Sequence, residues 1–527
     1  MKRDFLWWRD GIIYQIYIRS FKDTNNDGVG DLNGIISELD YLKELGVDAL
    51  WLSPLYPSPD VDYGYDVCDY RNINPQYGSM DDFNLLIKEA HQRKIHIILD
   101  IVLNHTSNQH PWFLESKKAK DNSKRDWYIW RDKMNNWESI FGGSGWELDE
   151  TTNEYYFHMF YKEQPDVNWR NPQLRKEMID ILDFWLKKGV DGFRFDVFNA
   201  FFKKKDFSDN PSKAGIRGFD RQSHINDIDQ PEMDGLLEEI RSLIDRNPER
   251  FTVGETFLGG PEKAAKYCGD HKMHETFNFD FLKCNWSPKE FMSAIQKWEN
   301  VLPEDGHPSY VLNNHDNPRS ATRYARGEND ERLKILAALL ITLRGTPFMY
   351  YGEEIGMRDI KVSRNQIKDP VGKRYWPFYS GRDGCRAPMQ WDTTKNAGFS
   401  KEKPWLNIHP DYMERNVVMQ REDKDSLFHF YKDLIRLRHE ETSIRDGLFL
   451  PLIYEPRSIM AYLRQSGDDM LMVVMNFGWR SMRFFIGNTL KKLNWKVVLN
   501  NQEFVLPEDR STPISLKANQ VVILKPE

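Results

Sequence analysis

The sequence predicts an α/β protein, a (β/α)8 barrel with a subdomain inserted after the third strand and a C-terminal antiparallel β-domain. Three strand-like segments support this fold, because each ends on an acidic residue: 192–196 on Asp196, 251–255 on Glu255 and 310–316 on Asp316. The carboxyl ends of the strands of such a barrel meet at one face, where its active sites lie. The three carboxylates are therefore expected to share one site.

Bulk composition indicates a soluble globular protein of several domains. The 527 residues exceed one ordinary core, so two or three domains are expected. The net charge of −7 argues against a nucleic acid as the main partner. The start of the chain lacks the apolar segment of a signal peptide, and the longest apolar run, 335–343, is too short to span a bilayer. We expect no membrane partner.

The cysteines indicate the redox compartment of the protein, and the aromatic residues are compatible with a sugar-binding cleft. Cys68, Cys268, Cys284 and Cys385 form no Cys-x-x-Cys pair, which is typical of free thiols in a cytoplasmic protein. Aromatic residues make up 13% of the chain. Most must belong to the core, but sugar-binding clefts also use aromatic faces.

Strands and helices alternate along most of the chain, which indicates βαβ units and a parallel sheet. The first strand, 12–18, is followed by strands at 49–53 and 96–102. Beyond the acidic strands, a weak strand near 276–281 and one at 347–352 bring the candidates to eight. Apolar periodicity predicts the main helices, at 34–45, 83–93, 173–188, 232–244, 330–343 and 426–439.

Two regions break this alternation and set the domain boundaries. Residues 106–168 are rich in Trp, Tyr, Asn, Gly and Lys without a helical period, which predicts an inserted subdomain that overhangs the site. The barrel then comprises 1–105 and 169–446. Residues 447–527 form the β-domain, because short strands follow one another without helices at 459–463, 470–475, 482–486, 496–499 and 520–524.

A loop after the first strand carries oxygen-bearing side chains at alternate positions. Asp23, Asn25, Asp27 and Asp31 surround Gly28, which permits a sharp turn. This pattern matches the first part of an EF-hand calcium loop, but the terminal Glu and the flanking helix pair are missing. The loop is therefore either a Ca²⁺ or Mg²⁺ site or a solvated turn.

The three strand-end carboxylates have the chemistry that glycoside hydrolysis requires. One carboxyl group protonates the leaving oxygen while another attacks the anomeric carbon. Crowding of like charges raises one pKa, which keeps the acid protonated near neutral pH. Arg194, two residues before Asp196, is expected to keep Asp196 ionised.

These motifs resemble those of the α-amylase family of (β/α)8 glycosidases, over nearly the whole chain. The matching stretches occur in the family's order and spacing, at 100–105, 192–196, 253–255 and 314–316. Within the family, the chain resembles the oligo-1,6-glucosidase and α-glucosidase group at 164–168 and 387–391. Val167 replaces a commoner Leu there, and Ala387 a usual Thr.

The resemblance implies a role for each matching residue. Asp196 is expected to be the nucleophile, Glu255 the general acid/base and Asp316 the group that binds sugar hydroxyls in the transition state. Arg386 is expected to close the end of the pocket, which would make the enzyme exo-acting, with Arg382 as the alternative. The other implied substrate-binding residues are Asp62, Tyr65, His105, Phe160, Arg194 and His315.

The same resemblance implies a structural Ca²⁺ or Mg²⁺ ion in the loop described above. Its ligands would be Asp23, Asn25, Asp27, Asp31 and the carbonyl of Val29.

We therefore expect a retaining, exo-acting α-glucosidase, a monomer or weak homo-oligomer, that releases glucose from short oligosaccharides or disaccharides with terminal α-1,6 or α-1,4 bonds. Val197 favours α-1,6 cleavage, since a Thr at this position accompanies α-1,4 cleavage in the group. The sequences around Cys385 and at 197–202 depart from the group's usual pattern, which leaves linkage preference open.

Three alternatives remain on the same scaffold or outside it. Trehalose-6-phosphate hydrolysis would need a basic cluster at the second sugar, and Lys203, Lys204 and Lys205 could supply one, although such a run usually faces solvent. A trehalose synthase-like or sucrose isomerase-like glucosyl transferase is the second alternative. A non-catalytic partner of a membrane transporter would have a broken triad and a membrane segment, and the sequence shows neither.

Overall fold

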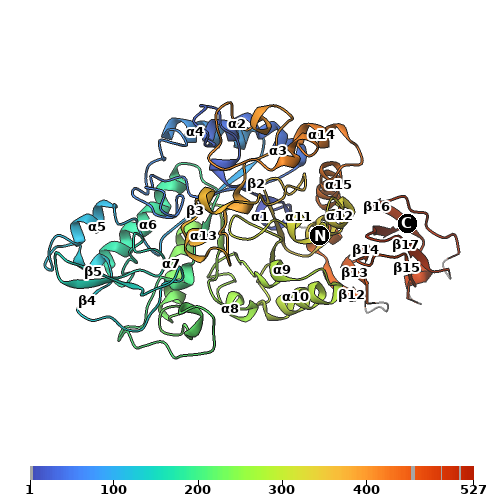
Figure 1. Cartoon of the computed structure of the whole chain (residues 1–527). Coiled ribbons are helices and arrows are strands. Elements are labelled where there is room, and N and C mark those ends of the chain that lie inside the picture. Colours follow the sequence, from blue (N-terminus) through green and yellow to red (C-terminus); the bar gives the residue numbers. More distant parts are fainter. Residues whose placement is uncertain (1–3, 453–456, 488–489, 510–511) are drawn as a thin grey trace.

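The computed structural model describes residues 4–452, 457–487, 490–509 and 512–527 (Figure 1). Eight parallel strands form one sheet in the order β10-β11-β1-β2-β3-β7-β8-β9. The side chain of Ser309 on β10 donates a hydrogen bond to the carbonyl of Thr276 on β9 (2.9 Å), which joins the two ends of the sheet. This confirms the barrel. The strands are β1 (Ile13–Ile16), β2 (Ala49–Leu52), β3 (His96–Ile101), β7 (Gly192–Phe195), β8 (Phe251–Gly254), β9 (Glu275–Thr276), β10 (Ser309–Val311) and β11 (Thr346–Tyr350).

Helices surround the barrel, and their ends follow local sequence signals. α4 (Met80–Gln92) begins after Ser79, which forms a capping box with Asp82. α6 (Pro172–Lys187) begins after the side-chain cap of Asn171. The other long helices are α7 (Glu232–Ile244), α10 (Pro288–Val301), α12 (Asp330–Thr342) and α15 (Leu427–Glu440). Shorter helices are α1 (Trp7–Asp10), α8 (Pro261–Ala265), α11 (Ser320–Tyr324), α13 (Pro370–Tyr375), α14 (Val417–Glu422) and α16 (Thr442–Asp446).

Two predicted elements differ in the structure. The helix expected at 34–45 is two helices, α2 (Leu32–Ser37) and α3 (Leu39–Leu45), because Glu38 leaves the helical conformation (φ −108°, ψ 10°). The strand expected at 276–281 is only β9. It ends early because the side chain of Asn278 accepts a hydrogen bond from the backbone N–H of Asp280 (3.1 Å), where helix α9 (Asp280–Lys283) begins.

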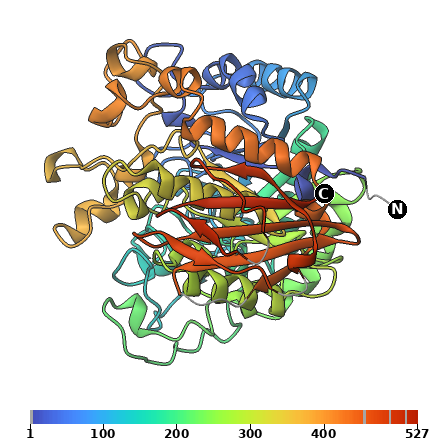
Figure 2. The same cartoon turned by 90° about the vertical axis from the view of Figure 1, so that its right-hand side faces the viewer.

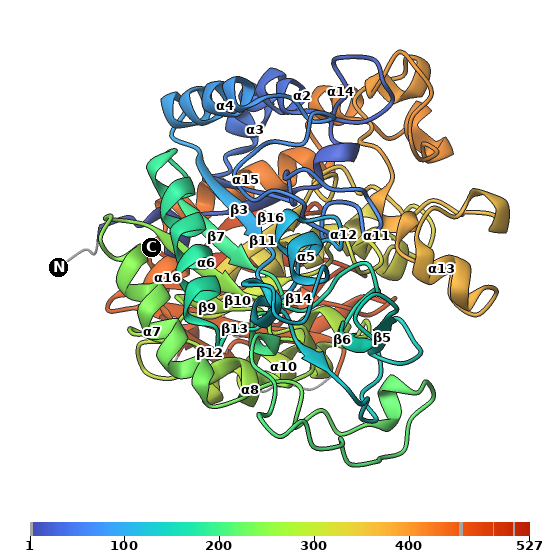
Figure 3. The same cartoon turned by 90° about the vertical axis from the view of Figure 1, so that its left-hand side faces the viewer.

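The segment after β3 folds into a small antiparallel sheet at the side of the barrel (Figures 1 and 3). Its strands are β4 (Trp130–Arg131), β5 (Trp146–Asp149) and β6 (Glu154–Phe157), with β6 in the middle. Helix α5 (Pro111–Ser116) precedes them, although the sequence showed no helical period here. Side chains from this segment reach the barrel cavity described below, as an overhanging subdomain should.

The C-terminal domain lies at the opposite end of the molecule from the inserted sheet (Figure 1), and its larger sheet faces the viewer in Figure 2. Thr342 at the end of α12 joins it to the barrel, because its hydroxyl pairs with Tyr462 (2.5 Å) and its carbonyl accepts a hydrogen bond from Arg464 (2.6 Å). Strands β12 and β17 were not predicted. The larger sheet contains β12 (Leu448–Leu452), β13 (Ile459–Ser466), β14 (Asp469–Asn476), β18 (Val521–Pro526) and β16 (Trp495–Asn500), and the smaller one β15 (Met482–Phe484) and β17 (Ile514–Leu516).

Candidate active site

The three predicted carboxylates line one cavity of about 220 Å³ at the carboxyl ends of the strands. Asp196 and Glu255 directly follow β7 and β8, and the N–H of Glu255 extends the strand ladder to the carbonyl of Phe195 (2.8 Å). Asp316 is held by a turn in which its N–H donates to the side chain of Asn314 (2.9 Å). The lining residues are Asp62, Tyr65, His105, Ile140, Phe141, Phe160, Asp196, Val197, Glu255, Phe257, Asp316 and Arg382.

One buried guanidinium serves three carboxylates, a group that we call the Arg194 cluster: Arg194, Asp100, Asp196 and Glu255. Arg194 pairs with Asp100 (2.8 Å), with Asp196 (2.7 Å) and with Glu255. Asp100 at the end of β3 was not predicted as a site residue, although it opens the matched stretch 100–105. Its carboxylate is buried, so it competes with Asp196 and Glu255 for the same positive charge.

The pKa values of the three carboxyl groups in the Arg194 cluster are raised. Burial is the largest cause and outweighs the opposing charge of Arg194, bringing the pKa of Glu255 to about 8, of Asp196 to about 7 and of Asp100 to about 6. A hydrogen bond between the carboxyl groups of Asp196 and Glu255 moves the two pKa values apart. Arg194 pairs with Asp196 and lowers its pKa, as expected, but its charge is shared among three carboxylates and burial outweighs it.

On the other side of the cavity lies a group that we call the Asp316 cluster: Asp316, which pairs with Arg382 (3.3 Å) and with Arg386 (2.9 Å). Burial would raise the pKa of Asp316, but His315 and the two guanidinium groups outweigh it and hold that pKa well below its usual range. Asp316 is therefore ionised at neutral pH.

Arg382 lines the cavity, whereas Arg386 does not. Arg382 pairs with Asp62 across the cavity (2.7 Å) and with Asp369 behind it (3.0 Å). Arg386 is fully buried behind Asp316, and its Nε donates to the carbonyl of His315 (2.8 Å). The preference for Arg386 as the residue that closes the pocket is thus not supported by its position, and the alternative, Arg382, occupies that place.

Neutral side chains surround this polar half of the cavity: Tyr65 and His105 line it, and His315 and Gln164 contact them without lining it. The Tyr65 hydroxyl contacts Asp100 (3.0 Å) and His315 (2.7 Å), and its ring stacks on His315. Burial lowers the pKa of His105 to about 4 and that of His315 to about 3, so both imidazoles are neutral at pH 7. Gln164, which was not assigned a role, donates to His105 (3.1 Å) from the stretch 164–168.

The other half of the cavity is apolar. Val197 lies directly after Asp196 with a left-handed backbone (φ 33°, ψ 40°), a strained conformation for a β-branched residue and one that is concentrated at functional sites. The Phe198 ring packs directly against Gly254. A Cβ at position 254 would lie 2.3 Å from that ring, so only glycine allows this close approach. The apolar lining comes from Ile140, Phe141, Phe160, Val197 and Phe257.

The lysine run at 203–205 is not a uniformly solvated loop. Lys203 is 1% exposed and pairs with the buried Asp166 (2.7 Å) and with Asn104 (3.1 Å). Asp166 in turn accepts from the N–H of Met159 (2.9 Å), so Lys203 ties the inserted segment to the barrel next to His105. Sequence alone gave no sign of this, because the partner carboxylate lies 37 residues away.

The predicted metal loop is closed by its own hydrogen bonds. Asp31 accepts from Thr24, Asn25 and Gly34, and Asp23 accepts from the N–H groups of Asn26 and Gly28. Across the described residues, no three His, Cys, Asp or Glu side chains are arranged to hold a metal ion. The exposed oxygens of Asn25 and Asp27 and the Val29 carbonyl are of the hard-donor type that Ca²⁺ and Mg²⁺ take. The metal assignment stays a prediction.

Comparison with known proteins places these features in context. Residues 15–447 match the model of the α-amylase catalytic domain. An oligo-1,6-glucosidase of Parageobacillus thermoglucosidasius is 38% identical over 94% of this chain and 95% of its own length. The structure of an α-glucosyl transfer enzyme superposes with a TM-score of 0.94 at 33% identity, covering 99% of this chain and 100% of that one. An isomaltulose synthase of Erwinia rhapontici NX5 gives 0.89 at 35%, covering 98% and 99%.

Proposed function

Because the chain belongs to the α-amylase family, we propose that it is a retaining, exo-acting α-glucosidase that releases glucose from short α-glucosides. The observation that carries this proposal is that Asp196 and Glu255 pair with the same guanidinium, Arg194, and so lie close together, and Glu255 has the higher pKa of the two. A protonated acid beside an ionisable carboxylate is the arrangement of a retaining glycosidase, whose two carboxyl groups lie close together. An inverting enzyme would leave room for a water between them.

The shape of the cavity supports exo action. The ion pair of Asp62 and Arg382 lies across its polar half, and about 220 Å³ is less than the roughly 300–1,000 Å³ of pockets for larger ligands. Such a cavity suits one terminal sugar unit. Asp316, Arg382 and the neutral imidazoles His105 and His315 supply hydrogen-bond partners for its hydroxyl groups.

Mechanistically, Asp196 attacks the anomeric carbon while Glu255 donates its proton to the glycosidic oxygen, so the bond to the leaving group breaks as a glucosyl–enzyme ester forms. Glu255, now ionised, accepts a proton from water, and that water cleaves the ester. Arg194 pairs with both residues, so it can oppose the negative charge that lies on Asp196 before the attack and on Glu255 in the ester intermediate.

A panel of substrates tests the proposal: maltose, isomaltose, sucrose, trehalose, trehalose 6-phosphate and longer dextrins. We expect free glucose from isomaltose-type bonds with some activity on other α-linkages, and α-glucose as the first product by polarimetry or NMR. β-Glucose as the first product would refute retention. Attack within dextrins without release of glucose would refute exo action.

Glucosyl transfer or isomerisation is the second candidate, favoured by the two transferase and synthase structures and by the apolar half of the cavity, which disfavours water. A rearranged disaccharide in place of glucose from sucrose would identify it. Trehalose-6-phosphate hydrolysis has less support. Lys203 is buried away from the cavity, and among the described lining residues Arg382 is the one Lys or Arg.

We propose further that the loop at 23–31 binds a structural Ca²⁺ or Mg²⁺ ion through the residues named above. A ligand that binds only the folded state raises Tm, so chelation should lower Tm and Ca²⁺ or Mg²⁺ should restore it. An unchanged Tm after chelation, with no ion bound by mass spectrometry, would show a turn held by hydrogen bonds alone.

The cellular setting is also a proposal. The four cysteines are free, which fits a reducing compartment such as the cytoplasm. In the described part of the chain, no helix is long and apolar enough to cross a membrane. A monomer or weak homo-oligomer remains our expectation, to be tested by light scattering across protein concentrations.

A further inference from the structure

The wall between the sugar cavity and an outer groove is built around one buried amide, Asn199. Its Oδ1 accepts from the backbone N–H of Phe257 (2.8 Å), and its Nδ2 donates to the Phe257 carbonyl (2.8 Å). Phe257 lines the cavity, and Asn199 follows Asp196 by three residues. A single side chain therefore fixes both backbone groups of a cavity residue from a different βα loop.

The second hydrogen of the Asn199 amide is bound by Asp229, on the far side of the wall. Asn199 Nδ2 donates to Asp229 Oδ1 (2.8 Å), and the N–H of Asp229 donates back to the Asn199 carbonyl (2.8 Å). Because a carboxylate oxygen accepts hydrogen bonds, Asp229 holds the Nδ2 end of the amide and leaves Oδ1 for the Phe257 N–H. Every donor and acceptor of the buried amide is satisfied, as a conformationally unique polar network requires.

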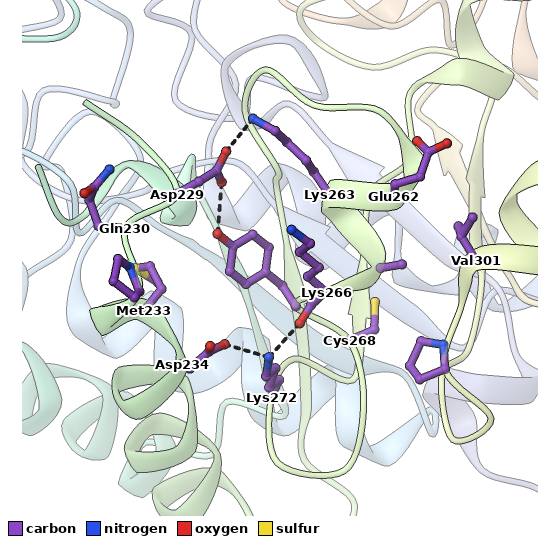
Figure 4. A pocket seen from close by; sticks show the side chains of 14 residues that line it. Asp229, Gln230, Met233, Asp234, Glu262, Lys263, Lys266, Cys268, Lys272 and Val301 are labelled. Atoms are coloured by element: carbon purple, nitrogen blue, oxygen red, sulfur yellow. Dashed lines mark hydrogen bonds and ion pairs between the residues drawn. The ribbon is translucent and has the colours of Figure 1, made fainter. Parts of the chain in front are cut away.

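Asp229 is held in place by side chains that line the outer groove, as Figure 4 shows. The groove, of about 630 Å³, lies between α7, α8 and residues 301–303. Asp229 accepts a hydrogen bond from the Tyr267 hydroxyl (2.9 Å) and pairs with Lys263 (2.7 Å). Lys266 lines the same groove but makes no ion pair with any described residue, which provides a matched control.

The network acts on the apolar half of the cavity. Asp62, Arg382 and Asp316 offer the hydrogen bonds that a terminal glucosyl unit needs, so its leaving group must lie toward Val197 and Phe257. Val197 and Asn199 belong to the same turn after β7, closed by a hydrogen bond from the N–H of Ala200 to the Val197 carbonyl (3.0 Å). Asn199 thus joins the two apolar walls that face the leaving group.

We propose that Asn199, held by Asp229, is a positioning residue for the leaving-group and acceptor side of the site, where it fixes Phe257 against the Val197 turn. The proposal rests on the α-glucosidase function proposed above. Loss of the Asn199 amide would leave Asp196 and Glu255 in place. It would loosen the wall that contacts the leaving group before the bond breaks and the acceptor molecule afterwards.

Two substrates separate this role from a merely structural one. Isomaltose fills the leaving-group side with a sugar, whereas α-glucosyl fluoride leaves it nearly empty. In Asn199→Ala we expect the ratio of kcat/KM for isomaltose to kcat/KM for the fluoride to fall about tenfold, the scale of one buried hydrogen bond. Misfolding lowers both values equally and leaves the ratio unchanged, so an unchanged ratio would overturn the proposal.

Further variants locate the effect within the network. Asp229→Asn should lower the same ratio, and Asn199→Ala should lower it no further in a Phe257→Ala background, because the target wall is already absent. Lys263→Met should shift the ratio by about twofold, and Lys266→Met should not. Additive effects of Asn199→Ala and Phe257→Ala would overturn the proposal.

An activity-free measurement keeps the two proposals distinguishable. Hydrogen exchange of the Phe257 amide should be faster in Asn199→Ala than in wild type by about tenfold or more, with peptides from α12 unchanged. If wild type hydrolyses neither substrate but the exchange result holds, the glucosidase function fails and the positioning contact stands. Unchanged exchange at Phe257 overturns the positioning role.

Discussion

The Arg194 cluster and the Asp316 cluster lie on two sides of the same cavity and pair carboxylates with guanidinium groups in different ways. In the first, one guanidinium serves three carboxylates. In the second, two guanidiniums face Asp316. The pKa of Glu255 rises to about 8, whereas that of Asp316 falls below its usual range, and the Asp316 side chain is also the more exposed of the two, at 33%.

The carboxylates of the two clusters are chemically alike but have different roles because their surroundings differ. A shortage of positive charge retains a proton on Glu255, as general acid catalysis needs. The ion pairs with Arg382 and Arg386 keep Asp316 ionised, and so an acceptor for sugar hydroxyls. Burial raises the pKa in both clusters, but His315, Arg382 and Arg386 together outweigh it at Asp316, whereas the one guanidinium shared in the Arg194 cluster does not outweigh it at Glu255.

The largest expected effect comes from removing the reacting groups of the Arg194 cluster. Asp196→Ala or Glu255→Gln should lower turnover of isomaltose by about 10⁴-fold or more, as loss of a reacting group does in other enzymes. The control is an unchanged Tm and circular dichroism spectrum. Near-normal turnover in either variant would refute the assignment of nucleophile and acid.

Removing one guanidinium from the Asp316 cluster should give the next largest effect. Arg382→Met leaves Asp62 without its partner and should lower kcat/KM by about tenfold to a hundredfold, the range of a charge-assisted hydrogen bond. Arg382→Lys keeps the charge without the planar fork and should lose less. Wild-type kcat/KM in Arg382→Met would return the closing role to Arg386.

The pH dependence tests the Arg194 cluster directly. Glu255 must be protonated, so kcat/KM should fall as the pH rises through about 8, and Asp196 must be ionised, so it should fall as the pH drops below about 7. Each limb should change about tenfold per pH unit. Because the two carboxyl groups share a hydrogen bond and Arg194, the apparent values belong to the pair.

The matching control uses α-glucosyl fluoride, whose leaving group does not need a protonated acid. With this substrate, wild type should therefore show no basic limb in kcat/KM, while the acidic limb that reports Asp196 remains. A basic limb near pH 5 in wild type would contradict a raised Glu255 pKa.

The sequence predicted what strand geometry determines. Parallel strands of a barrel bring their carboxyl ends together, so Asp196, Glu255 and Asp316 could be placed in one site from their positions at strand ends. The long helices other than α10 were predicted because periodicity and caps are local, as for α7, predicted and found at 232–244. The resemblance to known motifs supplied the individual roles.

The sequence did not predict contacts that depend on the path of an irregular segment or on the register between two strands. Arg382 belongs to a segment from 357 to 425 with little periodicity, so nothing local showed that it, and not Arg386, reaches the cavity. Lys203 looked solvated because its partner Asp166 is distant in sequence. The shared use of Arg194 was missed because it requires the register of β3 against β7, which pairs Asp100 with Arg194.

The smallest expected effect is on the preference between α-1,6 and α-1,4 bonds. It arises in the apolar half of the cavity, which belongs to neither cluster. Val197 borders the cavity directly after Asp196, in a strained turn that fixes the direction of its side chain. Thr has nearly the same shape but adds a hydroxyl group that can pair with a hydroxyl of the second sugar. One such contact is worth about 0.5–1.5 kcal/mol, which is up to about tenfold in selectivity. Val197→Thr should therefore shift the ratio of isomaltose to maltose kcat/KM toward maltose, with turnover of α-glucosyl fluoride as the control. If wild type cleaves maltose well and ignores isomaltose, Val197 does not set the linkage, and Phe257 with its support from Asn199 becomes the wall to alter next.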